Sequence, residues 1–277
     1  MGLRAWAPGR VNLIGDHTDY MGGLALPMAI GLGTEITGDR GGNWVMLGSD
    51  GFEGVAEIPL DGVPDPATVE PAWARYVAAV VQEVRPRDGL VGMVHSTLPA
   101  GSGLASSAAL EVAVATALGA DRVNPLAAAQ ACQRAEEAAV GVPCGIMDQL
   151  VSIAAVEGMA LRIDCDTLAI ETVPFPEDAE VVVIHSGEHR ELSTSAYAER
   201  RAECEAAEKV IGRLRDAAPV DVEHTDDPVL RRRARHVTTE NERVDALTSA
   251  LAQGQLAFAG ELLVASHASM RDDFDVS

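Results

Sequence analysis

The chain has 277 residues, with 42 acidic and 21 basic side chains and a formal net charge of −21. Its hydrophobic content of 47% and charged content of 23% are typical of a folded globular protein and exclude an intrinsically disordered chain. The excess of acid excludes nucleic acid as an expected partner, because phosphate backbones bind basic surfaces. No apolar run has the length of a membrane span and the first ten residues lack a signal-peptide core, so we expect a cytoplasmic protein with no membrane partner.

The elements predicted from hydrophobic periodicity place strands early and helices late, which is the pattern of an α+β protein. Val11, Leu13 and Ile14 read as a short buried strand between two turns, at Pro8-Gly9 and at Gly15-Asp16. The later predictions, in chain order, are strands within residues 24–60, a loop over 61–71, a helix over 72–84 ended by Pro86, a strand over 90–98, helices over 107–118 and 125–140, a helix followed by strands within 151–173, a buried strand over 181–185, and helices over 196–215, 228–251 and 255–271.

The four cysteines are sparse, and none forms a C-x-x-C pair. This usage favours reduced, neutral thiols over disulfides or a zinc site. The residues concerned are Cys132, Cys144, Cys165 and Cys204.

Polar side chains gather around the first predicted strand, in the sequence APGRVNLIGDHTDY. Arg10 carries a permanent charge and a planar fork of donors, which suits a phosphate. Asp16, His17 and Asp19 offer hydrogen-bond donors and acceptors with little apolar bulk, which suits the hydroxyls of a sugar. The plainer alternative is a solvated acidic loop with one surface arginine.

A glycine-rich turn, PAGSGLASSAALE, leads directly into a predicted helix. Gly101 and Gly103 allow the backbone to turn tightly, and Ser106 or Ser107 is expected to cap the helix. The unpaired N–H groups at such a helix start can hold phosphate. The turn matches neither G-x-x-x-x-G-K-[ST] nor the dinucleotide-binding G-x-G-x-x-G, and the alternative is that it is only a turn with serine caps.

A third polar segment has the sequence EEAAVGVPCGIMDQ. Glu136 is expected on the polar side of an alanine-rich helix, and the glycines and proline that follow let Asp148 project from a new turn. A solvated glutamate and a helix-capping aspartate are the ordinary alternatives. On spacing alone, Glu137 would serve as well as Glu136.

These three segments resemble the motifs of the galactokinases, which are members of the GHMP small-molecule kinase superfamily. The first is similar to PGRVNLIGEHTDYN, with Asp16 in place of Glu and Met21 in place of Asn. The second is similar to P-x-G-x-G-L-S-S-S-A, with Ala105 in place of the first serine, and the third contains C-G-I-M-D-Q without change. TTENERV at residues 238–244 and SHASMRDDFDVS at residues 266–277 also resemble family segments, so the resemblance extends from Ala7 onward.

The resemblance implies a two-lobed α+β GHMP kinase fold, with an N-terminal lobe over residues 1–165, a C-terminal lobe over 166–277 and the active site between them. It implies that ATP phosphorylates the anomeric hydroxyl of galactose. Arg10 and Asp148 would be catalytic, with Asp148 accepting or only holding the anomeric proton, and Ser107 and Glu136 would hold Mg²⁺. The implied sugar-binding residues are Asp16, His17, Asp19, Gly145 and Tyr197, and the implied nucleotide-binding residues are Gly101, Ser102, Gly103, Leu104, Ala105, Ser106 and Ser107, with Trp73 either packing on the adenine or buried as a core tryptophan of its helix.

Two other readings remain open at this point. A kinase for a related sugar, such as N-acetylgalactosamine or arabinose, is suggested by Asp16 and Met21. A non-catalytic sensor of sugar and nucleotide is suggested by the absence of the family's third glycine-rich motif, M-T-G-G-G-F-G-G. We expect a monomer whose C-terminal lobe is incomplete and exposes an apolar patch, formed by Leu256, Phe258, Leu262 and Leu263.

Overall fold

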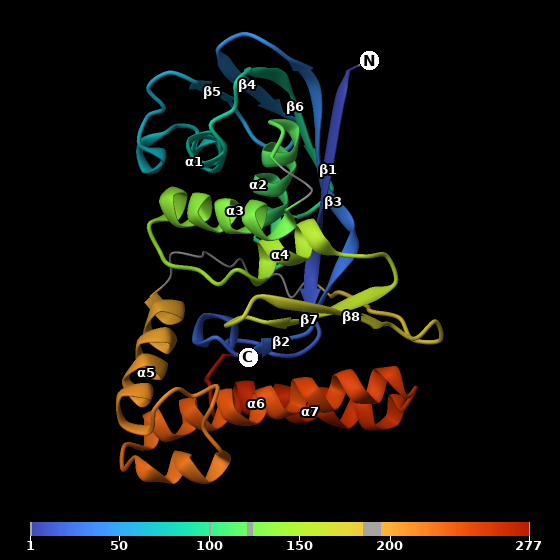
Figure 1. The fold of residues 1–277 in the computed structure, drawn as a ribbon, viewed down its shortest axis with the longest axis vertical. Coiled ribbons are helices and arrows are strands. Elements are labelled where there is room, and N and C mark those ends of the chain that lie inside the picture. Colours follow the sequence, from blue (N-terminus) through green and yellow to red (C-terminus); the bar gives the residue numbers. More distant parts are fainter. Residues whose placement is uncertain (1, 100, 121–123, 185–194, 277) are drawn as a thin grey trace. The chain divides into compact units, whose positions relative to one another are not determined.

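The computed structural model describes residues 2–99, 101–120, 124–184 and 195–276, and these form two compact units (Figure 1). The first unit contains residues 2–11 and 29–154, and the second contains Asn12–Met28, Ala155–Ile184 and residues 195–276. The described chain therefore passes between the units three times. The two lobes predicted from the sequence, residues 1–165 and 166–277, are each continuous in the chain, whereas the two units are not. The lobe boundary after residue 165 stays a prediction.

The first unit is built on a mixed sheet. Strand β1 (Leu3–Asn12) pairs with β3 (Pro27–Arg40), which pairs antiparallel with β6 (Leu90–Ser96). Strand β6 runs parallel to β4 (Trp44–Ser49), and β4 pairs antiparallel with β5 (Val55–Pro59) at the sheet edge.

Strand β1 begins earlier than predicted and ends at Asn12, so the strand prediction is wrong for Leu13 and Ile14. The expected turn at Pro8-Gly9 is also wrong, because both residues lie inside β1. A Cβ atom on Gly9 would come within 2.5 Å of Leu98 Cδ2 and 2.6 Å of the Leu104 carbonyl oxygen. Glycine is therefore required here for close approach of neighbouring backbone and side chains, not for a turn.

Helices α1 (Ala74–Val84), α2 (Ser106–Ala117), α3 (Pro125–Val140) and α4 (Met147–Ala154) complete the first unit, together with the short helix η2 (Pro66–Thr68). Apolar side chains of β4 and β5 pack against those of α1, and burial of this surface stabilises the unit. The members of this core that are buried most completely include Val45, Leu47, Ile58, Val77, Val80 and Val81.

The second unit contains strands β2 (Leu24–Ala25), β7 (Met159–Asp164) and β8 (Ala169–Pro174), helices α5 (Ser195–Ile211), α6 (Pro228–Ala252) and α7 (Leu256–Asp272), and the short helices η1 (Asp19–Met21) and η3 (Pro219–His224). Strand β7 pairs antiparallel with both β2 and β8. Helix α6 packs against α5, α7 and this sheet. Its apolar side faces a core that includes Ile14, Leu26, Ala160, Val244 and Leu247.

The buried strand predicted over residues 181–185 is wrong for the four residues that the structure describes. Residues 181–184 have no strand conformation, and the side chains of Val182 and Ile184 are 71% and 86% exposed. His185 lies outside the described residues. A run of β-branched residues gives strand propensity, but a strand forms only where a neighbour pairs with it, and no described strand pairs with this run.

Helix α7 exposes two of the four residues of the predicted apolar patch. Phe258 is 46% and Leu263 39% exposed, whereas Leu256 is half-buried and Leu262 packs against the core that contains Ile14. The prediction is therefore wrong for Leu256 and Leu262. Among the described residues, no helix is both long enough and apolar enough to cross a membrane.

Candidate active site

The site in the first unit centres on an ion pair between Arg10, near the end of β1, and Asp148, in the first turn of α4. Arg10 Nε donates to Asp148 Oδ1 at 2.7 Å and Nη2 donates to Oδ2 at 2.6 Å, so both carboxylate oxygens are held by one planar guanidinium. The Nη1 atom donates to the Gly103 carbonyl oxygen at 2.6 Å. The structure thus joins the two predicted catalytic residues to the glycine-rich turn.

The glycine-rich turn has the left-handed backbone that its glycines permit, with φ of 68° at Gly101 and 75° at Gly103. Helix α2 begins at Ser106, and its N-cap is Ala105, at φ 59°, which makes no side-chain cap. The prediction that Ser106 or Ser107 caps this helix is therefore wrong. Ser107 lies inside the first turn, and its Oγ donates to Glu136 Oε1 at 2.7 Å.

Glu136 is buried beside this helix start, 6% exposed, so the alternative of a solvated glutamate is wrong. Its second carboxylate oxygen accepts a hydrogen bond from Gln149 Nε2 at 2.6 Å. Glu137 instead accepts from the Cys144 backbone N–H, 3.3 Å away, so contacts distinguish two glutamates that spacing alone could not.

A second buried carboxylate lies on the other side of Gln149. The Gln149 amide nitrogen also donates to Glu111 Oε2 at 3.1 Å, and the Glu111 side chain is fully buried. Burial, and secondly the charge of Glu136, raise the pKa of Glu111 well above its ordinary value. Sequence reasoning missed both Glu111 and Gln149, although Gln149 is the last letter of C-G-I-M-D-Q.

The oxygen atoms of Ser107 and Glu136 fit a Mg²⁺ ion. They are hard ligands, and their separation of 2.7 Å lets one cation contact both. No cluster of three His, Cys, Asp or Glu residues suited to a metal occurs within the described part of the chain. This donor set is compatible with Mg²⁺, because that ion usually takes only one or two protein ligands and completes its shell with water and phosphate oxygens.

Trp73 occupies a core position immediately before α1. It is 7% exposed, its Nε1 donates to the Glu53 carbonyl oxygen at 3.1 Å, and its ring stacks on Phe52 with centroids 6.4 Å apart. These protein contacts match the alternative of a core tryptophan.

The predicted sugar-binding side chains Asp16, His17 and Asp19 lie in the second unit, on residues 15–24, which we call the polar loop. All three are half-buried. The His17 ring lies 5.9 Å from the Tyr197 ring of α5, and its Nδ1 is 3.1 Å from the Tyr20 hydroxyl. His17 and Tyr197 are therefore neighbours, as their shared predicted role requires. Gly145 belongs to the first unit, in the loop before α4.

The four cysteines are free thiols, as predicted. Burial raises the pKa of all four, in the case of Cys204 to about 12, so they stay neutral at physiological pH.

Comparison with known proteins agrees with this arrangement. The galactokinase galactose-binding signature matches residues 3–40, and the GHMP kinase N-terminal domain matches residues 74–155. The structure of Lactococcus lactis galactokinase complexed with galactose is similar to this chain, with a TM-score of 0.87 and 31% sequence identity over 100% of this chain and 76% of that one.

More distant structures share the fold alone. Mevalonate kinase of Methanococcus jannaschii has a TM-score of 0.56 at 16% identity, covering 90% of this chain and 80% of that one. Phosphomevalonate kinase of Streptococcus pneumoniae, in complex with phosphomevalonate and AMPPNP, has a TM-score of 0.60 at 15% identity, covering 98% and 80%. These matches confirm the predicted α+β GHMP kinase fold, and the signature and the Lactococcus structure show that the chain belongs to the galactokinase family.

Proposed function

We propose that this protein transfers the γ-phosphoryl group of ATP to the anomeric hydroxyl of galactose, giving galactose 1-phosphate and ADP. The observation that carries the proposal is the two-bonded pair of Arg10 and Asp148 beside the glycine-rich turn. The family and the galactose complex of the Lactococcus lactis enzyme support the choice of sugar.

Asp148 is the group that would orient the sugar. A carboxylate has about four lone-pair positions, so an oxygen that already accepts from Arg10 can also accept from a hydroxyl. In the proposed reaction Asp148 holds the anomeric hydroxyl in line with the γ-phosphorus and takes its proton as the new O–P bond forms. Because Arg10 holds both carboxylate oxygens, the acceptor is already oriented before the sugar binds.

The charge of the phosphates would be met by three features of the first unit. Arg10 supplies a permanent positive charge, and the start of α2 supplies N–H groups that no side chain caps. Ser107 and Glu136 would hold Mg²⁺, which neutralises charge on the phosphate oxygens when it is bound. These local groups matter because the net charge of −21 repels a nucleotide.

The ring hydroxyls of the sugar would be bound by Asp16, His17, Asp19 and Tyr197, with the Gly145 backbone as a further contact. A kinase for a related sugar is the second candidate, and one observation favours it. Asp16 is shorter than the glutamate of the galactokinase motif, so the pocket has room for a sugar altered at the carbon that this carboxylate reads.

The proposal is tested with the purified protein, ATP and Mg²⁺ against galactose, N-acetylgalactosamine, arabinose and glucose. ADP release is measured by a coupled assay, and the product is identified by ³¹P NMR. We expect the highest kcat/KM for galactose and a phosphate on its anomeric oxygen. Galactose binding without galactose-dependent ADP release would instead identify a non-catalytic sensor, and a higher kcat/KM for another sugar would reassign the substrate.

A further inference from the structure

Two of the segments that resemble family motifs, TTENERV in α6 and the stretch from Ser266 onward in α7, have no role in the reaction proposed above. Both belong to the second unit, which also contains the polar loop. Buried polar side chains of these segments bond to the polar loop or to residues that support it.

Three side chains of α6 bond to the backbone of the polar loop. Glu240 Oε1 accepts from the Gly15 N–H at 3.0 Å, and Asn241 Oδ1 accepts from the Leu24 N–H at 2.8 Å. One turn earlier, His236 Nε2 lies 2.9 Å from the Asp16 carbonyl oxygen. Residues four apart on a helix share a face, so His236 and Glu240 lie one above the other, and Asn241 adjoins Glu240. Together these three side chains bond to both ends of the loop.

The hydrogen bonding of His236 follows from its partners. A carbonyl oxygen can only accept, so Nε2 carries the proton and donates to Asp16, while Nδ1 lies 3.0 Å from the Ser269 hydroxyl. The ring also packs on Phe274, with centroids 4.5 Å apart, and Phe274 packs on His17 at 4.9 Å. Ser269 of α7 and Phe274, just after α7, thus contact His236, and Phe274 also contacts His17 of the loop.

Glu240 is fully buried and is satisfied by three donors. Besides Gly15 N–H, its carboxylate accepts from the Ser266 hydroxyl at 2.6 Å and from Arg243 Nε at 2.7 Å. The Gly15 N–H therefore bonds to a carboxylate that side chains of α6 and α7 hold in place.

The loop is also closed on itself. Gly15 has a φ of +91°, and a Cβ atom there would come within 2.5 Å of the Leu24 carbonyl oxygen. The Thr18 hydroxyl lies 2.9 Å from the Gly15 carbonyl and 2.7 Å from that of Leu24, between the two ends. A Cβ atom on Gly23 would come within 2.6 Å of Asn241 Oδ1, so the backbone is pressed against α6.

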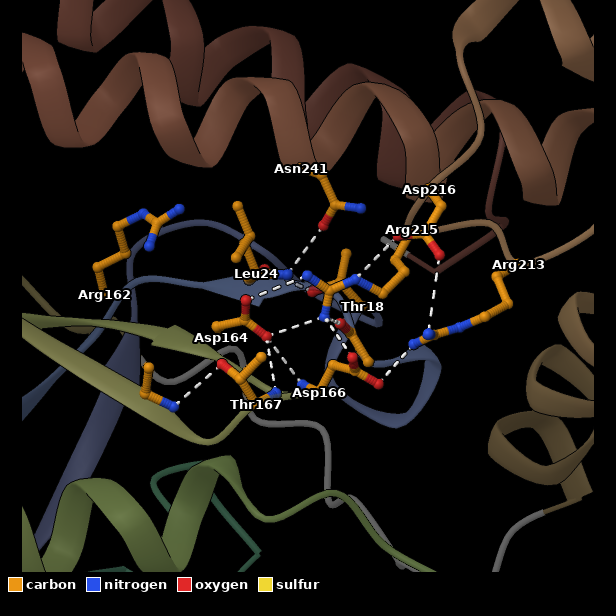
Figure 2. Close-up of polar contacts among 12 residues, drawn as sticks. Thr18, Leu24, Arg162, Asp164, Asp166, Thr167, Arg213, Arg215, Asp216 and Asn241 are labelled. Atoms are coloured by element: carbon orange, nitrogen blue, oxygen red, sulfur yellow. Dashed lines mark hydrogen bonds and ion pairs between the residues drawn. The ribbon is translucent and has the colours of Figure 1, made fainter.

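A further contact to the loop comes from Arg215, in the turn between α5 and η3. Arg215 Nη1 donates to the Gly22 carbonyl oxygen at 2.6 Å and to Asp164 Oδ1 at 2.8 Å. Figure 2 shows Asn241 reaching Leu24 from α6 while Arg215 lies beside Asp164 at the end of β7. The loop backbone is therefore bonded both to α6 and to Arg215, which Asp164 of β7 holds in place.

The three bonds from α6 described above all go to backbone atoms of the loop. These bonds order the backbone from which Asp16, His17 and Asp19 extend. A loop that is ordered before the ligand arrives loses less conformational entropy on binding, which raises affinity without changing the chemical step.

We propose that His236, Glu240 and Asn241 are positioning residues that preorganise the polar loop and set the affinity for the sugar, with little effect on the rate of phosphoryl transfer. The part that concerns the sugar rests on the proposed function. The part that concerns the order of the loop does not.

The first test compares Asn241→Ala, which removes the acceptor for Leu24, with Asn241→Asp, which keeps an oxygen there. Glu242→Gln, at an exposed position of the same helix, is the matched control. We expect Asn241→Ala to raise the KM for galactose about tenfold, with the KM for ATP and kcat at saturating galactose within about twofold of the unmutated protein. Asn241→Asp should recover most of the loss. An unchanged KM for galactose, or equal effects on both substrates, would overturn the proposal.

The second test uses hydrogen–deuterium exchange and needs no activity. Exchange of the Leu24 amide should be about tenfold faster in Asn241→Ala, and that of the Gly15 amide faster in Glu240→Met, which has no oxygen to accept from it, while amides of β6 keep their rates. Unchanged exchange at the loop would overturn the positioning role even if the kinetics changed. If the unmutated protein fails to bind galactose by calorimetry, the proposed function fails, and the exchange data still decide whether α6 orders the loop.

Discussion

Arg10 and Asp148 are 138 residues apart in the chain, yet the guanidinium of one binds both carboxylate oxygens of the other. Their side chains are 15% and 26% exposed, so the pair is reachable by a substrate and still partly shielded from water. An ion pair in such a position is stronger than one on the open surface, where solvent screens it. It fixes the acceptor of the proposed reaction.

The first prediction concerns this pair. Asp148→Asn keeps the shape of the side chain but replaces one acceptor with a donor, which Arg10 cannot bond, and removes the negative charge. In the assay of galactose-dependent ADP release, kcat should fall by about 10³-fold or more, while the Kd for galactose from calorimetry changes by less than about tenfold.

Arg10→Lys should lower kcat/KM by about 100-fold. A lysine ammonium cannot bind both carboxylate oxygens of Asp148 and also contact the transferred phosphoryl group. Arg4→Lys, at an exposed arginine that pairs with Glu35 on the same strand pair, is the matched control and should be near normal. Turnover close to normal in Asp148→Asn would remove Asp148 from the chemistry.

The second prediction concerns the pH dependence of stability at Glu111. The pKa of this carboxyl is raised by burial, so between its unfolded and folded pKa values the folded state holds a proton that the unfolded state has lost. The free energy of unfolding should therefore decrease as pH rises through this window. Glu111→Gln cannot ionise, so it should be more stable than the unmutated protein at pH 8.

This difference should be smallest at pH 4, where the unmutated side chain is largely protonated in both states. Urea unfolding at pH 4, 6 and 8 measures it. A constant difference across this range would mean that Glu111 does not change its protonation on folding.

The fold was predictable wherever local signals set it. Helix α3 has the predicted bounds, because Asn124 caps its start by accepting from Ala127 N–H at 3.1 Å, Pro125 opens it, and Gly141 ends it at φ 73°. Helix α1 was likewise predicted to within two residues at its start. These signals act within a few residues of each other and can be read from the sequence.

Features that depend on distant partners could not be predicted. Ser107 was expected to cap its own helix, but it bonds to Glu136, and Gly9 was assigned to a turn although its role is to admit neighbouring atoms. The same limit applies to the site. The motif resemblance predicted that Arg10 and Asp148 belong to one site. Nothing near Glu240 in the sequence, in contrast, indicates that it binds Gly15, 225 residues earlier.

The third prediction concerns the specificity of the sugar site. Asp16 is one methylene shorter than the glutamate in the galactokinase motif, so its carboxylate should stop about 1.5 Å short of the exocyclic hydroxyl of galactose. Asp16→Glu should then lower the KM for galactose, with a smaller effect on an analogue that lacks this hydroxyl. Steady-state kinetics with both sugars provide the measurement, and equal responses would show that residue 16 does not read that position.

The fourth prediction separates the observed conformation of residues 181–184 from the buried strand suggested by their composition. Since the side chain of Ile184 is 86% exposed, Ile184→Thr should change the free energy of unfolding by less than about 0.5 kcal/mol. A buried strand position would lose about 1–3 kcal/mol or more on the same change. Denaturant unfolding distinguishes the two, and Ile36→Thr, at a fully buried position of β3, is the comparison that should show the larger loss.

The alternation of the chain between its two units limits how this protein can be recombined with its relatives. The chain changes unit after Val11, after Met28 and after Ala154, so a single crossover cannot transfer the second unit intact. A chimera that received only residues 12–28 from another kinase would set a foreign loop backbone against the native face of α6. A chimera should therefore acquire the sugar specificity of its relative only when the polar loop and the contacting residues of α6 are transferred together, although they are distant in the sequence.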